Sequence, residues 1–194
     1  MNKYELTTKT LQYAGHTLHR IKALRDFGTI LAGELGGWVE KEENLSQVGN
    51  AWVYDNAKVY GNAKVYGEAK VCDNAKVRDN AWVFDYAWVQ DGARVRDNAR
   101  IFGNVWVRNQ AVIGGNAKVC NNADYIVFKN FWSSGRYFTW TRSNNKWSVG
   151  CFYGTGEELI KKAYADSEKS GREYERVVRY VESILADEKK EKSN

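Results

Sequence analysis

Proline is absent from this sequence of 194 residues, and cysteine, histidine and methionine are scarce, with three, two and one residues. A chain without proline keeps every backbone N–H available as a donor, which suits a body made of hydrogen-bonded strands. The cysteines, Cys72, Cys120 and Cys151, are odd in number and widely spaced. This pattern argues against a disulfide framework and against a zinc site, so we expect free thiols and no metal.

Long apolar segments are also missing. No run of residues approaches the length of a membrane span, and the N-terminus lacks the apolar stretch of a secretory signal. We therefore expect a cytoplasmic protein without a membrane partner. The net charge of +5 favours partners that carry negative charge.

A six-residue repeat fills the chain from 51 to 122. In nearly every unit an alanine is followed two residues later by valine or isoleucine, and two turn residues such as Gly61 and Asn62 close the unit. Because side chains alternate along a strand, the alanine and the aliphatic residue point inward and their neighbours point outward. Asn and Gly tolerate the left-handed backbone that a sharp corner requires, so three units make one triangular coil. The aliphatic positions are 53, 59, 65, 71, 77, 83, 89, 95, 101, 107, 113 and 119.

This pattern resembles the hexapeptide-repeat proteins, in which an aliphatic residue is followed four places later by a small one, as in Val53 and Ala57. The resemblance implies a mainly β fold, the left-handed parallel β-helix. Trp38 and Leu45 fall in the same register and predict an imperfect first coil. We expect three parts: an N-terminal β-hairpin cap and linker over 1–32, the β-helix over 33–123, and a small C-terminal α+β cap over 124–194.

The composition changes after Ala123, where the repeat ends. Three short strands are predicted near 125–128, 137–140 and 147–153, with turns at 133–135 and 144–145 between them. Two helices follow. Their starts are predicted from the capping-box spacing of Thr155 with Glu158 and of Ser170 with Glu173. The charged end from 188 to 194 is expected to fray.

Nearly the whole chain resembles hexapeptide-repeat proteins of unknown role that are encoded by bacterial phages and prophages. Outside the repeat, this resemblance rests on four segments: 15–24, 35–39, 43–46 and 150–155. It implies a phage-encoded protein that acts in the cytoplasm of the host cell.

Most characterised enzymes with this fold are acyltransferases, which resemble one another in using a histidine on or near the coils as a general base. The two histidines of this chain, His16 and His19, precede the coils and do not occupy that place. Related zinc enzymes need three histidine ligands, which this chain does not have. We therefore predict a protein that is not an enzyme and has no catalytic residue, cofactor or metal. An alternative stays open, in which a neighbouring subunit brings its cleft to His16.

The outward positions of the repeat are rich in cations and aromatic rings and contain no acidic residue. Residues one coil apart stack about 4.8 Å from one another, which divides the surface into three sides. Guanidinium groups bind phosphates and aromatic rings stack on bases, so this surface suits a nucleotide or a nucleic acid strand. The candidate ligand-binding residues are Lys58, Tyr60, Lys76, Arg78, Arg94, Arg96, Trp82, Phe84, Arg100 and Phe102. The candidate interface residues are Trp52, Tyr54, Trp88, Trp106 and Arg108.

These observations favour a non-enzymatic binding protein of phage type. It would sequester an anionic small ligand, such as a nucleotide signal of host immunity, on the outer faces or between subunits. Three alternatives stay open: an inhibitor or adaptor of a host protein, a hexapeptide enzyme similar to the acyltransferases, and a nucleic-acid-binding protein. Because aromatic columns also suit an interface between copies of the chain, we expect a homo-oligomer, with a trimer favoured over a dimer.

Overall fold

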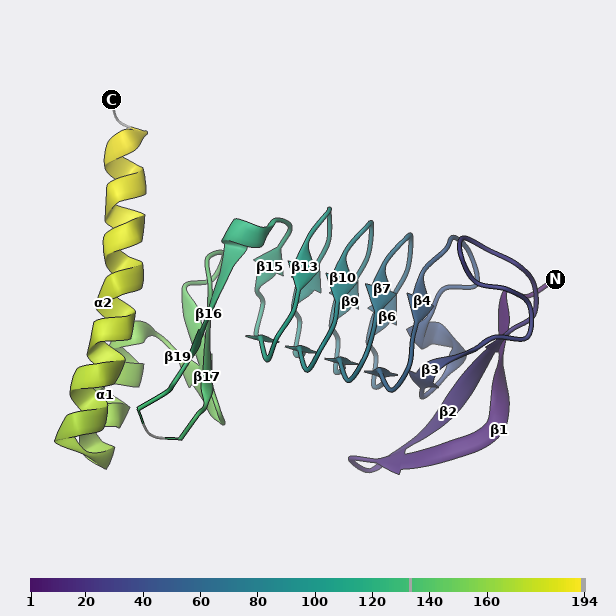
Figure 1. The fold of residues 1–194 in the computed structure, drawn as a ribbon, viewed down its shortest axis with the longest axis horizontal. Helices are drawn as coiled ribbons and strands as arrows, with labels where there is room; N and C mark the ends of the chain where they lie inside the picture. The colour runs from purple at the N-terminus through teal and green to yellow at the C-terminus, as the bar shows by residue number, and fades with distance from the viewer. Residues whose placement is uncertain (133, 193–194) are drawn as a thin grey trace.

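The computed structural model describes residues 1–132 and 134–192. A column of stacked coils lies between an N-terminal hairpin and a C-terminal sheet with two helices (Figure 1). The predicted fold class, a mainly β protein with a parallel β-helix, a hairpin cap and an α+β end, is confirmed. The division into 1–32, 33–123 and 124–194 as separate units stays a prediction. Ser133 of the predicted turn, and Ser193 and Asn194 of the predicted frayed end, lie outside the described residues.

Three parallel sheets form the sides of the coil, from strands of two residues each. Paired strands match residues one coil apart, as in Lys58 with Lys76 and Trp82 with Arg100, which is the stacking predicted from the repeat. The first sheet contains β4 (Trp52–Val53), β7 (Lys70–Val71), β10 (Trp88–Val89) and β13 (Trp106–Val107). The second contains β5 (Lys58–Val59), β8 (Lys76–Val77), β11 (Arg94–Val95) and β14 (Val112–Ile113). The third contains β6 (Lys64–Val65), β9 (Trp82–Val83), β12 (Arg100–Ile101) and β15 (Lys118–Val119).

The inward residues of the repeat fill the interior of the coil, and its turn residues form the corners. The inward alanine, valine and isoleucine side chains form one continuous buried core. Corner residues such as Asp79 (φ 60°) and Gly61 (φ 69°) have the left-handed backbone that a sharp turn needs. The Asp79 carboxylate also accepts a hydrogen bond from the N–H of Asp97, one coil further on, at 3.1 Å. The corner aspartates therefore belong to the turn structure, as predicted.

The first coil is irregular, as the sequence predicts. Its strand β3 (Leu35–Val39) lies parallel to β5, with Trp38 opposite Lys58. A short 3-10 turn (Glu42–Asn44) follows, and Leu45 then bridges to Val65. Gly36 is required here, because a Cβ at this position would lie 2.6 Å from the ring of Trp52.

The N-terminal hairpin closes this end of the coil. Its strands β1 (Tyr4–Tyr13) and β2 (His16–Ala23) are antiparallel, and β2 pairs with β3, so the hairpin extends the second sheet. The Tyr4 hydroxyl donates to the carbonyl of Leu45 at 2.7 Å, and the buried Lys3 ammonium donates to the carbonyl of Ala51 at 2.8 Å. These two side chains donate hydrogen bonds to backbone carbonyl groups that would accept from a preceding coil if the β-helix continued in this direction.

Lys3 should make the protein more stable as the pH rises from about 8 to about 10. Burial, aided by the charge of Arg25, lowers the pKa of Lys3 from 10.5 to about 8. Between these values the unfolded chain holds a proton that the folded protein has released, so the free energy of unfolding increases with pH, by up to about 3 kcal/mol. Urea unfolding at several pH values should show this rise in the wild type and not in Lys3→Met. An equal rise in both proteins would contradict the assignment.

The C-terminal sheet closes the other end of the coil. It contains, in antiparallel order, β16 (Tyr125–Lys129), β17 (Tyr137–Thr141), β18 (Lys146–Val149) and β19 (Phe152–Gly154), after a short turn of 3-10 type (Asn122–Asp124). Side-chain oxygens of this region bind the last strands of the coil. The N–H of Val112 donates to Thr139 at 2.9 Å, and the N–H of Lys118 donates to Ser143 at 2.7 Å. The strand edges at this end are therefore covered by side-chain acceptors instead of another strand.

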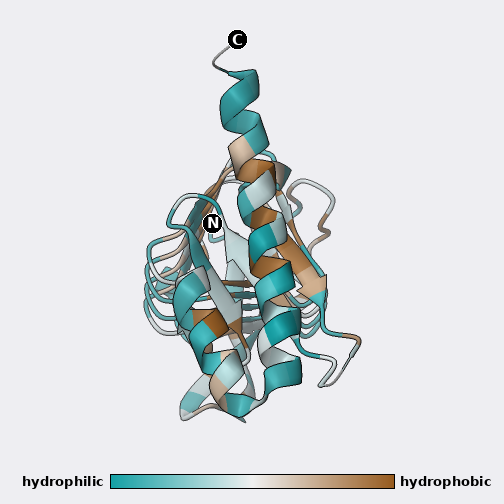
Figure 2. Cartoon of the chain, turned by 90° about the vertical axis from the view of Figure 1, so that its left-hand side faces the viewer, coloured by the Kyte–Doolittle hydropathy of each residue, from teal (hydrophilic) through white to brown (hydrophobic). Residues whose placement is uncertain are grey.

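Helices α1 (Gly156–Asp166) and α2 (Glu168–Glu191) pack on the outer face of this sheet (Figure 1). In Figure 2 both helices are mostly hydrophilic with separate hydrophobic bands, and their buried residues include Leu159 and Ile160 of α1 and Val178 and Val181 of α2. The capping box of Thr155 and Glu158 is present as predicted. No helix of the described part of the chain is both long and apolar enough to cross a membrane.

Two predictions about α2 are wrong. The helix begins at Glu168, because the Ser167 side chain accepts a hydrogen bond from the N–H of Ser170 and supplies the N-cap three residues before the predicted one. The charged end does not fray from Glu188, because the helix continues to Glu191 and the Glu188 carboxylate pairs with Arg142 at 2.6 and 3.0 Å.

Candidate active site

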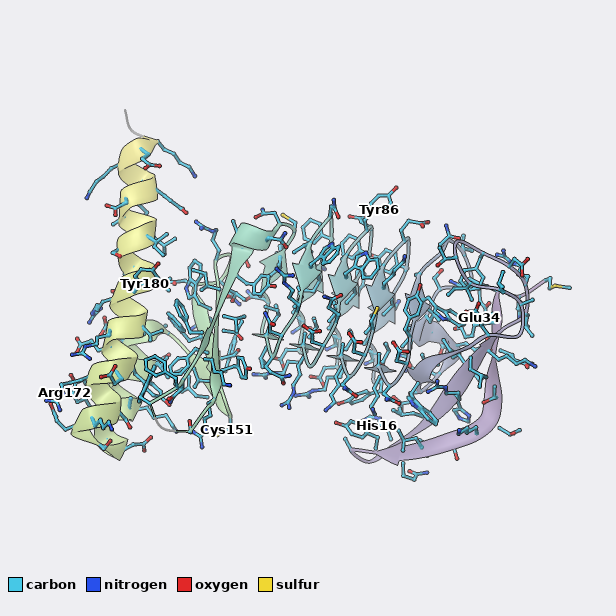
Figure 3. The ribbon with its side chains drawn as sticks, viewed as in Figure 1. His16, Glu34, Tyr86, Cys151, Arg172 and Tyr180 are labelled. Atoms are coloured by element: carbon cyan, nitrogen blue, oxygen red, sulfur yellow. The ribbon has the colours of Figure 1, made fainter. Side chains whose placement is uncertain are left out.

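The hairpin brings His16 to the side of the coil that carries β5 and β8. His16 is the first residue of β2 and follows a turn at Ala14 and Gly15, both of which have positive φ. Figure 3 shows His16 on the lower side of the molecule, beside the first coils. Its ring centroid lies 5.0 Å from that of Tyr60, and its side chain remains 34% exposed, so a substrate in solution can reach it.

His16 forms a pair with Glu40. Nδ1 of His16 lies 2.9 Å from Oε1 of Glu40, and Oε2 of the same carboxylate accepts the N–H of Gly61 at 2.6 Å. Burial alone would raise the pKa of Glu40, but the hydrogen bonds from His16 and Gly61 outweigh burial and lower the pKa. An ionised carboxylate only accepts hydrogen bonds, so Nδ1 carries a proton, and in the neutral form of the ring Nε2 keeps its lone pair. This is the arrangement of a histidine general base with an orienting carboxylate.

Two lysines lie at the tip of the hairpin, where Tyr13 pairs with His16. The Nζ atoms of Lys58 and Lys76 lie 5.1 and 5.3 Å from the ring centroid of Tyr13, at the tip of the hairpin. A hydrogen bond with Lys76, together with the charges of Lys76, Lys58 and Arg94, lowers the pKa of the Tyr13 hydroxyl. Burial, followed by the charge of Lys76, lowers the pKa of Lys58. The surface beside His16 therefore attracts anionic groups.

Part of the chain is similar to a protein of Escherichia coli. No protein-family model matches the chain. A stretch of 38 residues is 47% identical to an Escherichia coli (strain K12) protein named "Uncharacterized acetyltransferase YdcK", and the match covers 20% of this chain and 12% of that protein. The similarity is local.

This finding corrects the prediction that the protein is not an enzyme. The relative carries the name of an acetyltransferase, so the similarity points toward acetyltransferase-like hexapeptide proteins and away from a purely binding scaffold. The match gives no support to the predicted phage or prophage origin, nor to an anti-defence role. The sequence argument considered His16 to lie away from the coils, and the structure places it beside Glu40, which directly follows the first strand of the coil.

The predicted ligand-binding residues of the second sheet are brought together, with one exception. Lys58, Lys76 and Arg94 occupy equivalent positions on three successive coils. The exception is Tyr60, which packs against Leu18 beneath the hairpin and is only 6% exposed. Its face is therefore not available for stacking on a base, and burial raises the pKa of its hydroxyl.

The predicted ligand-binding residues of the third sheet form a separate cluster. The Phe84 ring stacks on Tyr66 and on Phe102, with centroids 4.9 and 5.2 Å apart and planes within 6° of parallel. Trp82 lies between two cations, with Lys64 5.7 Å and Arg100 5.0 Å from its ring. The ring faces are thus occupied by neighbours in the same chain, which favours the structural role of aromatic columns that the sequence left open.

The predicted interface residues differ in exposure. The expectation that Trp52 lies on the outer surface is wrong, because Tyr4 and Phe27 cover its ring at 6.1 and 5.2 Å and leave it 1% exposed. Trp88 and Trp106, further along the same column, stack at 5.4 Å and stay accessible. Two more candidates belong to the neighbouring column: Tyr54, which is half-buried, and Arg108, which is exposed.

Sequence reasoning missed Glu40, Gly61 and Tyr13. Glu40 directly follows Val39, a position that the repeat register identifies, but nothing in the sequence tells where the hairpin folds back. Among the described residues no group of three or more His, Cys, Asp or Glu side chains is placed to hold a metal ion. The three cysteines are free thiols, and burial raises the pKa of Cys72 to about 12.

Proposed function

We propose that the protein is an acyltransferase-like hexapeptide enzyme in which His16 is the general base. The observation that carries the proposal is the pair of His16 and Glu40, which leaves Nε2 of a half-exposed imidazole free to accept a proton. The local similarity to a protein named as an acetyltransferase supports the same class of reaction.

In the proposed reaction an acceptor hydroxyl or amine attacks the carbonyl carbon of an acyl thioester. Nε2 of His16 removes the proton from the acceptor as the new bond to carbon forms. The tetrahedral intermediate then expels the thiolate, which takes the proton back from the imidazolium. Glu40 stabilises the imidazolium and keeps the ring oriented, and Lys58 and Lys76 attract the anionic part of a substrate.

Replacement of His16 tests the proposal. Release of thiol from acetyl-CoA in the presence of a panel of hydroxyl and amine acceptors should fall at least about 100-fold in His16→Ala. The matched control is His19→Ala, because His19 lies on the opposite face of the same strand and its Nδ1 lies 3.2 Å from the carbonyl oxygen of Thr7. Retained activity in His16→Ala, or an equal loss in both variants, would remove His16 as the base.

The other sequence predictions remain predictions beside this proposal. In the proposed function, the anionic ligand predicted from the sequence corresponds to the phosphate-bearing part of a substrate. The nucleotide immune signal, the host protein partner, binding to nucleic acid, the cytoplasmic location and the homo-oligomer, with its trimer favoured over a dimer, rest on the sequence argument alone.

A further inference from the structure

A second cationic feature lies where the coil meets the C-terminal sheet. A cavity of about 260 Å³ is lined by Arg78, Arg94, Arg96, Val112, Gly150 and Cys151. An adjoining cavity of about 140 Å³ shares Arg94, Val112 and Gly150 and adds Gln110, Arg136 and Tyr137. We call the combined space the arginine hollow. Figure 3 shows Cys151 on the same lower side of the molecule as His16, at the opposite end of the coil.

The charge of the arginine hollow is unbalanced. Arg78 and Arg96 each pair with the aspartate that follows them, Asp79 and Asp97, at 2.9 Å. Within the described part of the chain, Arg94 and Arg136 form no ion pair with a carboxylate. Four guanidinium groups against two carboxylates leave a net charge of +2. Such a concentration of like charge is unfavourable unless an anion offsets it.

The paired guanidinium groups are oriented by contacts within the chain. Arg78 donates two hydrogen bonds to Asp79, at 2.9 and 3.1 Å. Arg96 is held by Asp97 and lies over the ring of Tyr153, 5.4 Å from its centroid. Gly114 leaves room for this arrangement, because a Cβ there would lie 3.3 Å from the guanidinium carbon of Arg96. Preorganised guanidinium groups are well suited to bind the oxygens of a phosphate.

We propose that the arginine hollow binds a phosphate group of a small molecule. A phosphate monoester or a diphosphate carries enough negative charge to offset the net charge of +2. Each guanidinium group can donate two parallel hydrogen bonds to two oxygens of the phosphate. The C-terminal sheet bounds the hollow on one side, which favours a compact phosphate over a long nucleic acid strand that would follow an open groove. Both a nucleotide and a phosphorylated acyl carrier contain this group.

The thiol of Cys151 provides a direct readout. Iodoacetamide should alkylate Cys151 at least about fivefold more slowly when pyrophosphate occupies the hollow. The bound anion covers the thiol and disfavours formation of the thiolate, which is the form that reacts. The exposed thiol of Cys120 in the same protein is the internal control, and its rate should not change. Equal protection of both thiols, or protection of neither, would overturn the proposal.

Calorimetric titration should give the affinity and the source of the phosphate. We expect Arg94→Gln to weaken pyrophosphate binding about tenfold or more, and Arg172→Gln, which removes the same charge from an exposed position on α2, to change it less than about twofold. Titrations with ADP and acetyl-CoA identify the preferred carrier, and either result supports the site. Equal losses in the two variants, or binding of a DNA oligonucleotide without pyrophosphate binding, would overturn the site. Because these readouts need no acyl transfer, the site and the proposed enzyme can fail separately.

Discussion

Replacement of Glu40 by glutamine is expected to lower acetyl transfer by about 10²- to 10⁴-fold while the protein stays folded. The two carboxylate oxygens of Glu40 each accept a hydrogen bond, one from the His16 ring and one from the N–H of Gly61. Glutamine has a single acceptor oxygen and therefore cannot serve both donors. The backbone N–H of Gly61 cannot change its role, so the amide oxygen should remain with Gly61.

The amide nitrogen of the introduced glutamine would then face Nδ1 of His16. Because this nitrogen only donates, it selects the tautomer in which Nε2 carries the proton, and the imidazole can no longer act as a base toward the acceptor. The loss should appear in kcat for acetyl transfer, with little change in the KM for acetyl-CoA.

The matched control is Glu43→Gln, which makes the same chemical change at a neighbouring exposed position. Circular dichroism and thermal unfolding would verify that both variants fold. Wild-type activity in Glu40→Gln would show that His16 does not depend on Glu40 for its tautomer, and the proposed dyad would be excluded.

Replacement of Trp52 by alanine should lower the free energy of unfolding by about 3 to 5 kcal/mol. Trp52 is one of the largest fully buried side chains among the described residues, and Tyr4 and Phe27 make edge contacts with its ring. Removing the indole leaves a cavity between the hairpin and the first coils, and the glycine at position 36 has no side chain with which to fill it.

The control for this prediction lies in the same column of the coil. Trp106 is equivalent to Trp52 in the repeat but is 43% exposed, so Trp106→Ala should cost less than about 1.5 kcal/mol. Urea denaturation of the two variants measures the difference directly. Equal destabilisation would mean that the N-terminal segment does not cover Trp52 in solution.

The sequence predicts the parts of this fold that depend on local rules. The inward alanine and valine, the corner aspartates and the capping box of Thr155 each follow from periodicity or from one backbone requirement, and the structure has them where they are expected. Trp52 obeys the same periodicity and is still misread. Its exposure depends on Tyr4 and Phe27, which come from segments far away in the sequence.

The candidate site is harder to predict for the same reason. His16 and Glu40 are separated by the rest of β2, a linker and β3, and the pairing of β2 with β3 brings them together. The arginine hollow combines the repeat with Arg136 and with the turn at Gly150, which belong to another part of the chain. The repeat identifies the cations on the coil, but it carries no information about which distant segment encloses them.

The sheet that carries β5, β8, β11 and β14 connects the hairpin end to the arginine hollow, and each coil adds about 4.8 Å to its length. The number of coils therefore sets the distance between His16 and the arginine hollow, and this distance can change only by whole coils. Inserting or deleting a complete coil would change the reach of the molecule without altering either end.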